Sequence, residues 1–140
     1  MADFAKLQDQ AAAAYAEGNA PMARRLYAEL VAHAPNDVRA WRRLGNLELM
    51  ADHPQQALND YGHALRLGGG NVGLWHNIAV IRVRQAEAAL AQVQAQPVKA
   101  GQGPLRAASA RAARLLRRAF PSPSPRPAGA TPHDASGEQP

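Results

Sequence analysis

The residues in this sequence that most often perform catalysis or bind metals are its histidines and a run of glycines. Five histidines share no metal-ligand spacing; they are His33, His53, His63, His76 and His133. Gly68-Gly69-Gly70 precedes an expected helix, but no strand comes before it and no lysine follows. A plain turn is therefore favoured over a phosphate-binding loop. The sequence has no nucleophile elbow or paired-carboxylate motif. It predicts no enzymatic activity, no metal site and no cofactor.

Arginines clustered between residues 105 and 120 are the second chemical feature. At 100° per residue they fall within a helical sector of about 140°; they are Arg106, Arg111, Arg114, Arg117 and Arg118. The opposite side holds Leu105, Ala108, Ala112, Leu115, Leu116 and Phe120. The favoured interpretation is a capping helix that lays its apolar side on the preceding helices. The alternative is a basic adaptor helix that contacts nucleic acid or an anionic membrane. Both roles are compatible, because a docked cap still exposes its arginines.

The positive charge of the chain is concentrated in one third of its length. The formal net charge is +5, and residues 72–120 carry eight Lys/Arg against one Asp/Glu. This asymmetry indicates an anionic partner.

No cysteine is present, which excludes disulfides and thiolate metal sites. The first residues do not resemble a signal peptide, and no segment approaches the ~18–20 apolar residues of a membrane span. The expected location is the cytoplasm, or the periplasm if a leader has been removed.

The elements that would position these side chains follow a repeat of 34 residues. Its columns are Leu7, Trp41 and Trp75; Ala11, Gly45 and Ala79; Ala23, Ala57 and Ala91; and Tyr27 and Tyr61. A period of this length is typical of stacked helix pairs rather than of a compact enzyme. The small residues are expected where the two helices of a pair cross, Gly45 opposite Ala57, and the tryptophans are expected in the interior between units.

Two copies of the repeat resemble the tetratricopeptide repeat (TPR) signature. The second copy supplies Trp41, Leu44, Gly45, Ala57, Tyr61 and Ala64, and the first supplies Ala11, Gly18, Ala23, Tyr27 and a closing Pro35. The resemblance implies an all-α fold, an α-solenoid of about two and a half to three TPR helix pairs with a C-terminal capping helix and a disordered tail. The resemblance covers about residues 4–96. The expected TPR array spans residues 1–96, with repeats at about 4–37 and 38–71 and a degenerate one at 72–96.

Glycines and prolines place the predicted helices. Helices are expected over residues 3–17, 21–34, 38–51 and 54–67. Asn36 or Asp37 is expected to cap the third helix, and Asp52 the fourth. No glycine or proline occurs near residues 84–87, so 74–96 is predicted to be one long helix. A short second helix beginning near Glu87 is the alternative. Residues 97–104 form a loop, 105–120 the basic amphipathic helix, and 121–140 a disordered tail rich in Pro and Ser.

The TPR resemblance also implies where a partner would bind. In that family the first helix of each pair builds the concave wall, and by register the peptide-binding groove would present Gln8, Tyr15, Arg39, Arg42, Asn46, Leu49, His76 and Arg84. Arginine can grip a carboxylate through two N–H bonds, so the expected partner is a protein or peptide segment, acidic in character. The alternative is that Arg39, Arg42 and Arg43 form a solvated helix face.

One TPR subtype binds the C-terminal carboxylate of heat-shock chaperones through a defined set of lysines, asparagines and an arginine. The corresponding positions here are Gln8, Ala12, Arg43, Gly73 and Asn77, and none matches. That ligand class is therefore disfavoured. The resemblance more generally implies a protein-binding adaptor, scaffold or chaperone, of the kind that acts in bacterial secretion, pilus or envelope assembly.

Overall fold

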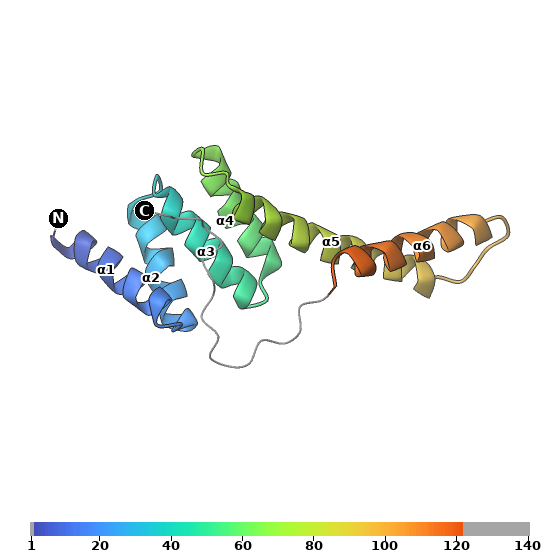
Figure 1. Cartoon of the computed structure of the whole chain (residues 1–140), viewed down its shortest axis with the longest axis horizontal. Coiled ribbons are helices and arrows are strands. Elements are labelled where there is room, and N and C mark those ends of the chain that lie inside the picture. The colour runs from blue at the N-terminus through green and yellow to red at the C-terminus, as the bar shows by residue number, and fades with distance from the viewer. Residues whose placement is uncertain (1, 122–140) are drawn as a thin grey trace. The chain divides into compact units, whose positions relative to one another are not determined.

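The structure is a computed structural model that describes residues 2–121. Within that range the chain is all-α, and no strand occurs. Its helices are α1 (Ala2–Ala16), α2 (Ala20–His33), α3 (Val38–Met50), α4 (Pro54–Arg66), α5 (Val72–Ala95) and α6 (Gly103–Ala119) (Figure 1). The predicted tail lies, apart from Pro121, outside the described residues.

Local capping interactions explain where α2 and α3 begin. The side chain of Asn19 accepts a hydrogen bond from the Met22 N–H, and that of Asp37 accepts one from the Ala40 N–H. The predicted cap at Asp52 is wrong. Asp52 has a φ of 60° and lies in the turn after α3, while His53 precedes α4 and makes no side-chain cap. Asp and Asn tolerate this left-handed conformation better than most residues. Asp52 therefore terminates α3 and does not cap the N-terminus of α4.

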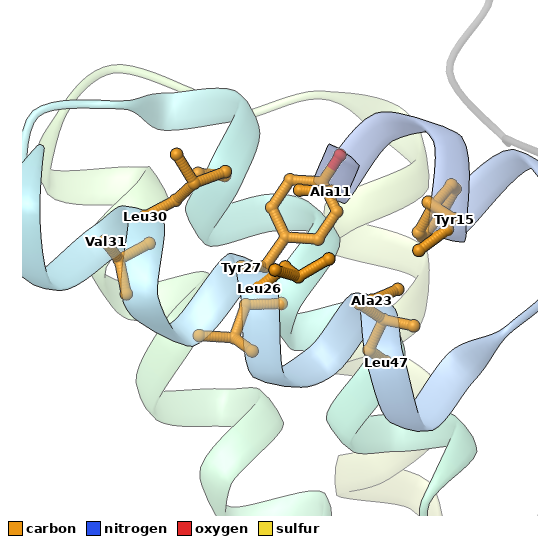
Figure 2. Packing of buried hydrophobic residues seen from close by; sticks show 11 residues of the cluster. Ala11, Tyr15, Ala23, Leu26, Tyr27, Leu30, Val31 and Leu47 are labelled. Carbon is orange, nitrogen blue, oxygen red and sulfur yellow. The ribbon is translucent and has the colours of Figure 1, made fainter. Parts of the chain in front are cut away.

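The first compact unit reaches from the start of the chain to Ile78. In it α1 packs on α2, α2 on α3, and α3 on α4. A buried apolar cluster joins α1, α2 and α3; it includes Tyr15, Leu26, Tyr27, Leu30 and Leu47 (Figure 2). The small residues Ala11, Ala23 and Ala57 are completely buried, which agrees with close helix crossings.

Gly45 is also buried, and the Tyr61 ring lies against it. A Cβ atom placed on Gly45 would lie 2.6 Å from Cε1 of Tyr61. The absence of a side chain on α3 thus makes room for an aromatic ring from α4.

The third repeat does not form a helix pair, and α5 is one continuous helix, as the absence of glycine and proline near 84–87 predicts. Two expectations for this repeat are wrong. Ala79 and Ala91 are exposed instead of lying at a crossing, and Trp75 is 56% exposed instead of filling the interior. The physical reason is that a helix without a turn cannot fold back on itself to cover these positions.

The second compact unit contains the rest of α5 from Ala79, the connecting residues 96–102 and α6 (Figure 1). Arg106 joins its two helices: Nη2 donates to the Gln94 carbonyl at 2.7 Å, and the Arg106 carbonyl accepts from Gln94 Nε2 at 2.9 Å. The buried residues of α6 are Ser109 and Ala113. The predicted burial of Leu115 and Phe120 is wrong, since they are 66% and 41% exposed.

Candidate functional site

A polar hollow lies among α1, α2 and α3 in the first unit. It has a volume of about 430 Å³ and is lined by Gln8, Asp9, Ala12, Tyr27, Leu30, Asp37, Arg39, Ala40 and Arg43. Each helix contributes side chains at spacings of three or four residues, because such residues share one face of a helix. We call this feature the α1–α3 hollow.

Arg43 is the most firmly held charged side chain of the α1–α3 hollow. Its Nη1 donates a 2.6 Å hydrogen bond to the hydroxyl of Tyr27. Its guanidinium carbon lies 4.8 Å from the ring centroid of Tyr15, a distance typical of a cation–π interaction. Tyr15 and Tyr27 meet edge to face with centroids 6.1 Å apart. The guanidinium is therefore fixed by two aromatic residues, and it loses little further freedom when an anion binds.

The remaining charges of the α1–α3 hollow are of both signs. Arg39 is exposed, one helical turn from Arg43. Asp9 and Asp37 also line the hollow, and Asp37 Oδ1 already accepts from the Ala40 N–H at 2.9 Å. The hollow is thus suited to a ligand that carries a carboxylate beside hydrogen-bond donors, and less suited to one that is uniformly acidic.

A second polar network lies where α3, α4 and α5 meet within the first unit. Oδ1 of Asn46 accepts from the Tyr61 hydroxyl at 2.7 Å and from Asn77 Nδ2 at 3.1 Å. Asn77 Nδ2 also lies 3.1 Å from the Tyr61 oxygen. Burial is the main cause that raises the pKa of Tyr61 to about 12, so this phenol remains a hydrogen-bond donor at physiological pH.

Sequence reasoning missed an ionic cluster between α2, α3 and α4. His53 Nδ1 lies 2.7 Å from Glu48 Oε2. Arg24 Nη1 lies 3.8 Å from the same oxygen. The pair escaped notice because its five-residue spacing crosses the end of α3 and is not a helical offset.

Asp60 is a buried carboxyl group near this cluster. It is 9% exposed, and its Oδ2 has no hydrogen-bond partner in the part of the chain that the structure describes. Burial and, secondly, the charge of Glu48 raise the pKa of Asp60 to about 7. A sequence signal for this burial exists, since Asp60 lies between Ala57 and Ala64 on the buried side of α4.

The residues of the predicted groove fall into four groups. Gln8 and Arg39 line the α1–α3 hollow, while Tyr15 and Asn46 belong to the adjoining aromatic and amide contacts. Arg42, Leu49 and His76 are not among the residues that line it. Arg84 belongs to the second unit. Besides Gln8 and Arg39, the hollow is lined by Asp9, Ala12, Tyr27, Leu30, Asp37, Ala40 and Arg43.

The arginines of α6 also differ in their surroundings. Arg106 is half-buried and hydrogen-bonded to Gln94, whereas Arg111, Arg114, Arg117 and Arg118 are exposed.

Over residues 2–121 no helix is long and apolar enough to cross a membrane, and no group of three or more His, Cys, Asp or Glu side chains is placed to hold a metal ion. The chain was compared with protein-family models, with curated proteins and with solved structures, and no match was found.

Proposed function

We propose that the first unit is a TPR-like array whose concave side binds a segment of another protein, so that the chain acts as an adaptor, scaffold or chaperone. The order of packing supports this, because α1 packs on α2, α2 on α3 and α3 on α4, each on the next helix along the chain. The repeat columns support it as well, since Ala11, Ala23 and Ala57 are all completely buried. Stacked helix pairs of this kind commonly function through extended binding surfaces.

The observation that carries the proposal is the pair Arg39 and Arg43 in the α1–α3 hollow. Arg43 is oriented by Tyr15 and Tyr27, and Arg39 is exposed. Together with the amide of Gln8 they can bind a carboxylate through charge-assisted hydrogen bonds. The proposed ligand is an extended segment with one acidic side chain or a terminal carboxylate, since Asp9 and Asp37 would repel a run of acidic residues.

The experiment begins with selection of binders from a random peptide library on the intact protein. The affinity of a selected peptide is then measured for the parent and for two matched variants, Arg39→Glu and Arg42→Glu. We expect Arg39→Glu to weaken binding about tenfold to a hundredfold, as loss of a charge-assisted hydrogen bond would. Arg42→Glu makes the same charge change on the same helix outside the hollow. Equal effects of the two variants would overturn the assignment of the hollow.

The cellular role is proposed from the resemblance alone. Small bacterial proteins with this signature act in secretion, pilus or envelope assembly, and we propose such a role here, in the cytoplasm. Capture of partners from the native lysate tests it, with the Arg39→Glu variant as the comparison. A set of captured proteins unchanged by that substitution would place the partner surface elsewhere.

A further inference from the structure

Helix α6 packs through a different side from the one its sequence makes most apolar. Its buried positions are Ser109 and Ala113, which are small. Its large apolar residues remain accessible: Leu105 is 65% exposed, Leu115 66% and Phe120, at its end, 41%. Packing therefore covers one edge of the apolar side and leaves the rest of it in contact with water.

The uncovered apolar residues form a continuous strip, which we call the leucine stripe. Its members recur at intervals of three or four residues and so share one face of the helix; they are Leu105, Ala108, Ala112, Leu115 and Ala119. Ala112 is half-buried and the other four are exposed. Exposed leucines arranged in this way mark an interaction surface more often than isolated ones do.

An arginine row runs along the edge of the leucine stripe. Arg111, Arg114 and Arg118 are exposed and follow one another at three and four residues. Arg117 is exposed as well. The described ion pairs all involve Glu48, so none of these arginines forms one within residues 2–121. No Asp or Glu occurs anywhere from residue 88 to residue 121. The surface thus combines apolar area with positive charge that forms no ion pair among residues 2–121.

We propose that α6 docks in the plane of an anionic membrane surface. The leucine stripe enters the boundary between headgroups and acyl chains, and the arginine row contacts lipid phosphates, as expected of an interfacial amphipathic helix. The exposed leucines favour lipid over nucleic acid as the occupant. A phosphodiester backbone calls for cations and stacking aromatics, and α6 offers no aromatic residue before its end at Phe120.

The test measures co-sedimentation of the full chain with vesicles of phosphatidylcholine alone or with about a third phosphatidylserine. We expect binding to the phosphatidylserine vesicles at 50 mM salt and strong weakening at 300 mM. Replacement of Arg111, Arg114 and Arg118 by glutamine should reduce the affinity about a hundredfold, since each arginine near the surface contributes a factor of about five. Replacement of Leu105 and Leu115 by serine should reduce it about tenfold without lowering the melting temperature.

The matched control is the Arg25→Gln, Arg66→Gln, Arg82→Gln variant, which removes the same charge from exposed positions on α2, α4 and α5. It should bind these vesicles within about threefold of the parent. If the control and the α6 arginine variant lose vesicle affinity equally, the loss reflects net charge alone and the proposal is overturned. Undiminished binding by the serine variant, or binding to a 20-nucleotide duplex that exceeds binding to the vesicles, would overturn it as well. None of these outcomes bears on peptide binding by the α1–α3 hollow.

Discussion

Gly45 determines how closely the Tyr61 ring can approach α3. A Cβ at this position would overlap the ring, and Tyr61 is itself fully buried and hydrogen-bonded to Asn46. Gly45→Ala should therefore lower the free energy of unfolding by about 1–3 kcal/mol, and Gly45→Leu by more. Thermal melting followed by circular dichroism measures the effect.

Gly62 provides the control for that prediction. It lies inside α4, where an added Cβ would meet only the end of the Arg66 side chain, at 3.5 Å. Gly62→Ala should raise stability by about 0.5–1 kcal/mol, because alanine loses less backbone entropy in a helix. Destabilisation of both variants to the same extent would contradict the account of Gly45.

Asp60 should make the stability of the first unit depend on pH. Its pKa is raised to about 7 in the folded chain, against about 3.9 for an unfolded aspartate. Between these values the folded state holds a proton that the unfolded state has released. The free energy of unfolding should therefore fall as pH rises from about 4 to about 7, and this contribution should stay constant above that.

The Asp60→Asn variant isolates this contribution from that of the nearby Glu48, Arg24 and His53. It should lack the fall between pH 4 and 7, and at pH 8 it should be more stable than the parent by about 1–3 kcal/mol, because no unpartnered charge is buried. Urea unfolding at pH 5 and pH 8 supplies the comparison. Parallel pH profiles for the two proteins would refute the role of Asp60.

Single residues of the candidate site were only partly predictable from the sequence. Gln8 and Arg39 of the predicted groove line the α1–α3 hollow, whereas Arg43 lines it and its neighbour Arg42 does not. Adjacent helical residues point about 100° apart, so register alone does not decide which of two neighbours lines a hollow. The stacking of Arg43 on Tyr15 depends on two helices whose relative rotation no local pattern specifies.

At the scale of elements, the packed side of α6 can be tested by two equivalent substitutions. Ala113 is buried and Leu115 is 66% exposed. Ala113→Asp should lower the melting temperature of the second unit, because it buries a charge that has no partner. Leu115→Asp should change it little. Both variants are melted in buffer without lipid and followed by circular dichroism. Greater sensitivity at Ala113 supports this packing, whereas the predicted cap would require Leu115 to be the sensitive position.

The first and last residues of α1 to α4 were predictable to within about one residue, whereas the packed side of α6 was not predictable. Asn19, Pro21, Asp37 and Pro54 act locally at helix ends, so their effects can be recognised without knowing the tertiary structure. The packed side of α6 depends instead on which positions allow close approach. Ser109 and Ala113 do so because they are small, although a pattern of apolar residues points toward Leu115 and Leu116.

At the scale of the whole molecule, the two units should differ in local stability. The large buried cluster lies in α1, α2 and α3, whereas α6 buries only two small side chains among the described residues. Amide hydrogen exchange should therefore be slow in α2 and α3 and faster, by at least about tenfold, in α6 and the C-terminal part of α5. Exchange measured by mass spectrometry tests this, and equal protection of α3 and α6 would contradict it.

The unequal surroundings of the two tryptophans give the chain an intrinsic optical reporter. Trp41 stacks on His63 with ring centroids 4.0 Å apart and donates from Nε1 to the Pro35 carbonyl at 2.8 Å, while Trp75 is largely exposed. Fluorescence of a Trp41→Phe variant should come from a water-exposed indole, red-shifted and readily quenched by acrylamide. A Trp75→Phe variant should emit at shorter wavelength and resist the quencher. Unfolding should shift the emission of the Trp75→Phe variant and hardly alter that of the Trp41→Phe variant. Intrinsic fluorescence of the Trp75→Phe variant can therefore follow unfolding of the α3–α4 pair without an added dye.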